Sequence, residues 1–334
     1  MYFHQLGFSL KSKTVKNIFS FAAVFILCCF TIISNAQKQK PDTVKTGVYV
    51  TSIHDIDFKQ KEYTLDLWLW LRYKNKKFDF ANNLEIPQAK TVTRSFLTID
   101  SSAGDIYMIM KLQCVMKDSW RIDNFPFDKQ RLKLTIENSQ YDLNSLVFEV
   151  DTLGQHYDPK FTLTDWNIDS CNVATGTKKY ETAFGDTSYT KPQTEYSSFR
   201  LAIVLRRNAS GLFWKMFTGM YIAFLLSYIC FYIHADSIDS RYALTVGSLF
   251  AVIGNKYIID SSLPESISYT LVDRLHSLTL LFIFLIVMLT TFSLNLVKKN
   301  QLQKAIRFDM VTAQIILVLY VIINLWYIYQ ATSS

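Results

Sequence analysis

The chain has 334 residues, half of them hydrophobic, and a formal net charge of +7 at pH 7. This length allows two domains of ordinary size. The basic residues are scattered or lie beside apolar runs, where they set the orientation of a membrane protein, so the charge does not indicate nucleic-acid binding. Residues 37–208 are mixed and polar, whereas residues 211–330 are dominated by apolar runs.

Residues 1–36 are typical of a secretory signal peptide. Three lysines precede an apolar run over residues 18–33, and the small residues that follow form a cleavage site after Ala36. A retained membrane anchor is the alternative, but the run is short for a membrane span. We expect cleavage, which places the polar domain outside the cytoplasm.

Residues 37–208 are predicted to form an all-β domain. Between Tyr63 and Tyr73, leucines at every second position alternate with polar or aromatic residues, which is the period of a half-buried strand. Further strands are predicted at 44–53, 91–99, 106–117, 131–137, 146–150, 163–173 and 197–206. Many short strands separated by polar turns are typical of an immunoglobulin-like β-sandwich.

The reactive side chains show no catalytic or metal-binding pattern. Of the five cysteines, Cys114 and Cys171 lie in the predicted β-domain, and the sequence leaves open whether they pair. His234 and His276 are typical of interfacial or packed histidines, and no nucleotide-binding loop or hydrolase motif occurs. We therefore predict no enzyme activity, no cofactor and no metal site. A membrane-anchored enzyme is the most distant alternative.

Residues 209–334 contain four apolar runs that are long enough to cross a bilayer. The spans are predicted at 212–233, 242–259, 275–297 and 310–329. With the β-domain outside, the basic segment 298–307 lies in the cytoplasm, which satisfies the positive-inside bias. We predict a multi-pass protein of the plasma (inner) membrane.

The second apolar run differs from an ordinary lipid-facing helix. It carries Asn255 and Lys256, and polar groups at membrane depth normally face protein or water. Small, acidic and aromatic residues recur along one face of this helix and are predicted to line a pore. They are Asp239, Ala243, Gly247, Phe250, Gly254, Tyr257 and Asp260. Because one helix cannot enclose a channel, a pore requires several copies of the chain; a buried transporter or enzyme helix is the alternative.

Residues 120–130, WRIDNFPFDKQ, resemble the signature loop of the pentameric ligand-gated ion channels, the Cys-loop receptor family. The proline between two aromatic residues fixes a tight turn with an apolar tip that can press on a membrane domain. The resemblance covers nearly all of the mature chain. Residues 66–75 are similar to the second strand of the family, Arg206-Arg207 ends the last strand, and Leu263-Pro264 follows the pore helix.

The chain departs from the family pattern at a few positions. The paired cysteines of animal receptors fall on Asp118 and Leu132, so the resemblance implies a prokaryotic-type member without that disulfide. The proline of the first span corresponds to Gly219, which also permits an irregular helix.

The resemblance implies a homopentamer, one chain with four identical subunits, around a central ion pathway in the lipid bilayer. Ligand binding between neighbouring β-domains would open the pore. The residues that match the ligand-binding positions are Trp68, Ser139, Tyr141, Tyr189 and Tyr196. Aromatic faces attract ammonium groups by about 0.5–2 kcal/mol each. A small amine is therefore the predicted agonist, and a proton is the alternative.

Gating residues are also implied. Phe250 is the predicted barrier, and acidic rings of Asp239 and Asp260 favour cations unless Arg241 faces the lumen. Asp128 is expected to pair with either Arg206 or Arg207. The full predicted gating interface is Phe125, Pro126, Phe127, Asp128, Arg206, Arg207, Leu263 and Pro264. A non-conducting ligand sensor of the same fold is the remaining alternative.

Overall fold

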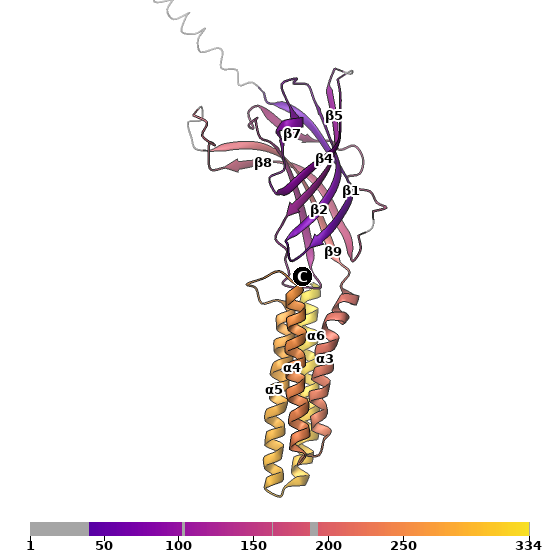
Figure 1. The fold of residues 1–334 in the computed structure, drawn as a ribbon, viewed down its shortest axis with the longest axis vertical. Helices are drawn as coiled ribbons and strands as arrows, with labels where there is room; N and C mark the ends of the chain where they lie inside the picture. The colour runs from indigo at the N-terminus through magenta and orange to yellow at the C-terminus, as the bar shows by residue number, and fades with distance from the viewer. Residues whose placement is uncertain (1–39, 102–103, 162, 188–192, 334) are drawn as a thin grey trace, which may run out of the picture. The chain divides into compact units, whose positions relative to one another are not determined.

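The computed structural model describes residues 40–101, 104–161, 163–187 and 193–333, and the predicted signal peptide lies outside these ranges. Within them, β-strands precede a group of four long helices along the chain (Figure 1). The last strand, β9 (Thr194–Arg207), is followed after a single residue by α3 (Ala209–Tyr228). So short a connection leaves little freedom between the end of the strand and the start of the helix.

The strands of the described residues form two sheets. One has the order β4-β5-β2-β1-β7 and the other has the order β3-β6-β9-β8. Neighbouring strands are antiparallel except β1 and β7, which are parallel. The other strands are β1 (Asp42–Asp57), β2 (Glu62–Tyr73), β3 (Leu84–Glu85), β4 (Ala89–Asp100), β5 (Ile106–Lys117), β6 (Lys129–Asn138), β7 (Leu146–Val150) and β8 (Trp166–Tyr180); the short helix α2 spans Phe80–Asn83.

The alternating leucines of β2 lie at the centre of the sandwich core. All four are at most 2 % exposed, whereas the residues between them are half-buried. They share the core with apolar residues of the second sheet, such as Leu134 of β6 and Leu201 of β9. Burying one such side chain contributes about 1.5–3 kcal/mol relative to leaving it exposed. The predicted all-β sandwich is therefore confirmed, with the core on the predicted face of β2.

Strands β1 and β8 extend well past the ends that the sequence pattern predicts. In β1 a register shift between Val50 and Ser52 interrupts the alternation that marks a strand. In β8 the residues after Val173 are exposed or half-buried and pair only with β9, so they show no apolar period. The two cysteines of the β-domain do not pair: Cys114 is buried on β5, Cys171 lies on β8 in the other sheet, and both are free.

The four long helices of the described residues are apolar and long enough to span a membrane. After α3, which continues as the short 3-10 helix η1 (Ile229–Tyr232), they are α4 (Ile238–Ser262), α5 (Leu271–Lys298) and α6 (Leu302–Ser333). The last three extend beyond the predicted apolar runs because their first turns include charged residues such as Asp239, Asp273 and Lys304. The Thr270 hydroxyl accepts a hydrogen bond from the Asp273 N–H, and the Asp273 carboxylate accepts one from the Thr270 N–H. This reciprocal cap starts α5.

Candidate functional site

The residues of α4 separate into two opposite stripes. The stripe that packs inside the subunit recurs every three or four residues and is polar over its first half. Its buried members are Arg241, Thr245, Ser248, Val252 and Ile259. The hydroxyls of Thr245 and Ser248 donate to backbone carbonyls one turn earlier, so these polar groups are satisfied within the helix.

The exposed stripe of α4 contains all seven residues predicted to line a pore. Phe250 and Tyr257 are 71 % and 75 % exposed. A Cβ atom added at Gly247 or Gly254 would meet no atom within 4 Å, so neither glycine serves close helix packing inside the subunit. The exposed faces of α5 and α6 instead carry large apolar side chains suited to lipid. The role of the α4 stripe in a pore stays a prediction.

Arg241, at the inner end of α4, points away from the exposed stripe. Its side chain is 4 % exposed, and its Nη2 atom lies 2.8 Å from Oδ2 of Asp309 on α6. It also donates to the Ile233 carbonyl after η1. Among the described residues, Arg241 Nη1 and Asp309 Oδ1 find no hydrogen-bond partner. The pair therefore anchors α4 to α6 but is incompletely satisfied.

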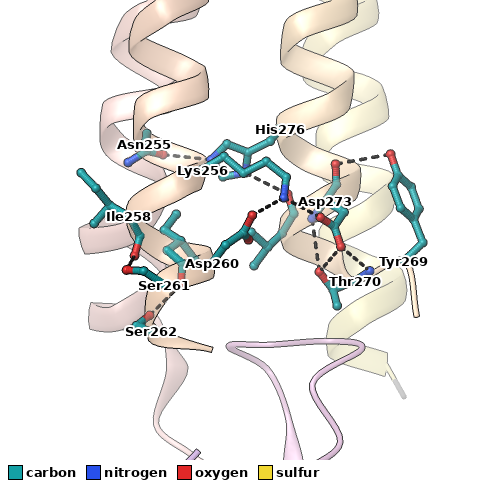
Figure 2. Close-up of polar contacts among 12 residues, drawn as sticks. Asn255, Lys256, Ile258, Asp260, Ser261, Ser262, Tyr269, Thr270, Asp273 and His276 are labelled. Atoms are coloured by element: carbon teal, nitrogen blue, oxygen red, sulfur yellow. Dashed lines mark hydrogen bonds and ion pairs between the residues drawn. The ribbon is translucent and has the colours of Figure 1, made fainter. Parts of the chain in front are cut away.

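Lys256, near the outer end of α4, lies at the interface with α5. Its Nζ atom lies 2.5 Å from Asp260 Oδ2 on α4 and 2.8 Å from Asp273 Oδ1 on α5 (Figure 2). Its charge therefore offsets part of the negative charge of Asp260. Asp239, at the other end of α4, has no ion pair within the described residues.

Asp128 and Arg207 form a buried ion pair at the base of the β-domain. Arg207 donates from Nε to Asp128 Oδ1 at 2.7 Å and from Nη2 to Oδ2 at 3.2 Å, and the side chains are 8 % and 2 % exposed. Gln130 donates a further hydrogen bond to Oδ2 at 2.7 Å. This two-pronged geometry is the strong form of an arginine–carboxylate pair. Arg206 is not the partner, because it points the other way and pairs with Asp169.

Three aromatic rings surround the Arg207 guanidinium. Its Cζ atom lies 4.0 Å from the ring centroid of Trp166, 4.7 Å from that of Phe58 and 4.9 Å from that of Phe125. A desolvated contact of this kind contributes about 2 kcal/mol. Phe125 belongs to the predicted interface, but sequence reasoning missed Phe58 and Trp166. The one aromatic residue in an otherwise polar turn between β1 and β2 was the signal available for Phe58.

The signature loop packs onto the outer ends of the long helices. The N–H of Leu271, the first residue of α5, donates to the Asp123 carbonyl at 2.8 Å. Phe125 is buried in a cluster with apolar residues of α3, α4 and α5. The Phe127 ring lies 5.5 Å from that of Phe213 on α3. The loop therefore contacts three helices at once.

The predicted membrane-side partner of the loop is Leu263-Pro264, directly after α4. Pro264 is buried, and Leu263 packs against the cluster that contains Phe125. Pro126 is buried as well. A hollow of about 460 Å³ remains between the β1–β2 turn, Phe125 and Leu263.

The residues predicted to bind a ligand have different surroundings. Trp68 on β2 is half-buried and meets the Phe96 ring edge-on at 5.4 Å. Ser139 is exposed in the segment after β6. Tyr141 packs edge-on against Phe78 at 4.7 Å, which makes its ring part of the sandwich. The structure does not bring these three residues together within one chain.

Tyr196 belongs to an aromatic cluster that sequence reasoning found only in part. Its ring lies 5.8 Å from that of Tyr180, which meets the Phe184 ring at 5.4 Å. The Tyr180 hydroxyl donates to Glu137 Oε2 at 2.7 Å. Tyr189, predicted to act with Tyr196, lies outside the described residues. Glu137 and Tyr180 are distant in sequence and meet because β6 and β8 flank β9.

The Glu137 carboxyl is the buried acid of this cluster. Burial raises its pKa above the ordinary value, the Tyr180 hydrogen bond opposes that shift, and the charge of Glu85 adds to it. An ionised carboxylate beside two tyrosine rings offers both a counter-charge and aromatic faces to an ammonium group.

Comparisons with known proteins agree with this architecture, although no protein-family model matches the chain. It is 24% identical over 264 residues to the glycine receptor subunit beta of Rattus norvegicus, covering 70% of this chain and 50% of the relative. It is 23% identical over 296 residues to the neuronal acetylcholine receptor subunit alpha-9-II of Oncorhynchus mykiss (79% and 51%). It is also 23% identical over 224 residues to the glutamate-gated chloride channel of Drosophila melanogaster (64% and 43%). The chain spans about half the length of these curated relatives.

The relatives and the four apolar helices make the chain a multi-pass membrane protein with an extracellular N-terminal β-domain. Its signature loop docks onto those helices through the contacts described above. Together the loop, the β-sandwich followed by four membrane-capable helices, and the relatives make the chain similar to the subunits of pentameric ligand-gated ion channels.

Proposed function

We propose that the chain is one subunit of a homopentameric ligand-gated ion channel. After removal of a signal peptide at residues 1–36, residues 37–208 bind a ligand between neighbouring subunits, and residues 209–334 form the pore. The observation that carries this proposal is the division of α4 into a polar stripe packed inside the subunit and an opposite stripe left exposed. Four further copies of α4 would complete the wall of a pore.

The exposed stripe of α4 supports a gate at Phe250. This is the bulkiest apolar residue in the middle of the stripe, and Gly247 and Ala243 leave more space toward the inner end. A ring of five phenylalanines would close the pathway by excluding water rather than by a charge barrier. Tyr257 forms a second narrow ring nearer the outer mouth.

The acidic residues of α4 support cation selectivity. Arg241 is paired with Asp309 away from the stripe, so it does not oppose an acidic ring. Asp239 is exposed and unpaired among the described residues, whereas Lys256 offsets the charge of Asp260. We therefore place most of the selectivity at the inner ring of Asp239.

A small amine is the agonist that the β-domain supports best. Glu137 supplies a counter-charge, and Tyr180 and Tyr196 supply aromatic faces on the same side of the sandwich. Trp68 lies on the other sheet, so it would reach this site from a neighbouring subunit, as the family resemblance implies. Ligand binding would then favour one arrangement of β9 by its differential affinity for the two states.

The signal would pass from β9 to the helices through Arg207. This residue is held by Asp128 of the signature loop and stands two positions before α3. The loop in turn bonds to the first residue of α5 and packs on α3. A shift of β9 would thus act on both helices that flank α4.

Currents from the full-length chain test the proposal directly. We would express it in oocytes, apply a panel of small amines, and compare it with Phe250→Ala and with Phe284→Ala, whose ring is exposed on the outer face of α5. Agonist-evoked current with a cation reversal potential, and leak current in Phe250→Ala alone, are expected. Silence of all three chains, with a pentamer confirmed at the surface, would instead favour the non-conducting sensor.

A further inference from the structure

Asn255 joins three helices near the outer end of α4. Its Nδ2 atom donates to the Met216 carbonyl of α3 at 3.2 Å. Its Oδ1 atom lies 2.9 Å from Nε2 of His276 on α5 (Figure 2). Gly219 of α3 makes room for this contact, because a Cβ atom there would lie 3.3 Å from Asn255 Nδ2. The glycine that stands in place of the family's proline therefore has a packing role.

His276 is fully buried, and both of its ring nitrogens face oxygen acceptors. Nδ1 lies 2.8 Å from the Val272 carbonyl one turn earlier, and Nε2 faces Asn255 Oδ1. A neutral imidazole carries one N–H donor and one acceptor, whereas an imidazolium donates from both nitrogens. The contacts around the ring therefore match the protonated form.

Rotating the Asn255 amide does not remove this requirement. The rotation would let Nδ2 donate to a neutral His276, but it would set Oδ1 against the Met216 carbonyl, where two acceptors meet. With a neutral ring, one of the three hydrogen bonds is lost in either orientation. The choice of amide orientation, which is otherwise ambiguous, thus leaves the conclusion unchanged.

The charged groups around the ring come from two helices. Lys256 and Asp260 of α4 and Asp273 of α5 act on His276, and α3 presents the Phe217 ring at 5.6 Å. Burial, the largest of these effects, and the ammonium group disfavour a charged imidazole, while the two carboxylates favour it. A hollow of about 320 Å³, lined in part by Lys256, Asp260 and Asp273, lies beside this group.

We infer that His276 and Asn255 form a proton-binding site in the membrane domain. A proton taken up by the lone pair of the neutral ring completes the hydrogen bonds that tie α4 to α3 and α5, and its loss releases one of them. Because α4 carries the proposed gate, the inference that protons modulate gating rests on the channel function proposed above. The proton site itself does not rest on it.

Thermal unfolding of the purified full-length chain tests the site without any current. The difference in unfolding midpoint between the wild type and His276→Gln should change by about 2–4 °C as the pH falls from about 8 to 5. His234→Gln is the matched control, since His234 is exposed and paired with Asp236 away from the network. The difference in unfolding midpoint between His234→Gln and the wild type should stay small over the same pH range. A wild-type to His276→Gln difference that does not change with pH would overturn the site.

Currents then separate the site from its role in gating. The pH dependence of amine-evoked current should vanish in His276→Gln and persist in His234→Gln. Asn255→Asp, which offers the ring a carboxylate, should move the pH of half-maximal modulation upward by about one unit, and it serves if His276→Gln fails to assemble. Two results together would contradict proton control of the gate. One is a current that keeps its pH dependence in His276→Gln, and the other is an unchanged pH of half-maximal modulation in Asn255→Asp. Absence of current in every chain would count against the channel proposal alone.

Discussion

A buried arginine–aspartate pair lies at each end of the membrane domain, one at the base of the β-domain and one at the inner end of the helices, but the pairs are built differently. At the outer junction, both oxygens of Asp128 are bonded by Arg207, a glutamine adds a third hydrogen bond, and three rings surround the guanidinium. At the inner end, Arg241 meets Asp309 through one short contact, and one polar atom of each finds no partner among the described residues.

We interpret the outer pair as a junction that fixes the orientation of the groups around it. The inner pair mainly holds α4 and α6 together. A fully bonded buried pair orients every group around it, whereas a partly bonded pair keeps much of its desolvation cost. Removing one partner of either pair strands a buried charge at a cost of about 3–5 kcal/mol. Replacing both partners together should distinguish the two pairs.

The largest expected effect is at the outer junction. Asp128→Ala should abolish agonist-evoked current while the pentamer still reaches the surface, because Arg207 loses its orienting carboxylate. Whole-cell current and surface labelling measure the two outcomes. Asp169→Ala is the matched control, since Asp169 pairs with the neighbouring Arg206 at an exposed position. Normal current from Asp128→Ala would refute this coupling route.

A double replacement at the inner end should have a smaller effect. Arg241→Met with Asp309→Leu should keep the unfolding midpoint and the pentamer yield near wild type or raise them, because an incompletely bonded buried pair can be exchanged for apolar packing. Asp309→Leu alone should lower both. If the double variant is as unstable as the single one, the inner pair is more than an anchor.

The ligand site above the outer junction should show its own pH dependence. Burial raises the pKa of Glu137, so lowering the pH protonates it at a less acidic pH than usual and removes the counter-charge for an amine. The agonist concentration for half-maximal current should rise roughly tenfold across this titration, with maximal current preserved. Glu137→Gln should show the weakened affinity at every pH. Unchanged affinity in that variant would place the amine elsewhere.

The smallest effect concerns ion selectivity at the two ends of α4. Asp239→Asn should lower the ratio of cation to anion permeability more than Asp260→Asn does, because Lys256 already offsets the charge of Asp260. Reversal potentials in dilution experiments provide the ratio. A larger effect of Asp260→Asn would place the selective ring at the outer mouth.

Sequence periodicity predicted much of this molecule, and its limits are physical. The alternating leucines of β2 and the spacing along α4 are local patterns, so both faces could be predicted. The choice between Arg206 and Arg207 was also within reach, because Leu205 and Arg207 share the core face of β9. The Glu137–Tyr180 contact could not be predicted from the sequence, since it depends on which strands flank β9.

The same limit applies to the membrane domain. His276 has the sequence context of a packed histidine, and its significance depends on an asparagine from another helix and a glycine from a third. No spacing within one helix indicates such a meeting. Arg241 is similar, because only the position of Asp309 on α6 shows which way it points.

Cysteine accessibility along α4 tests the central claim most directly. Single cysteines at Gly247 and Gly254, on the exposed stripe, and at Thr245 and Val252, on the buried stripe, would be treated with a charged thiol reagent during agonist-evoked current. The unmodified chain, with its own cysteines, gives the background. We predict block at Gly247 and Gly254 alone. Block at Thr245 and Val252 with none at the glycines would contradict a pore lined by the exposed stripe.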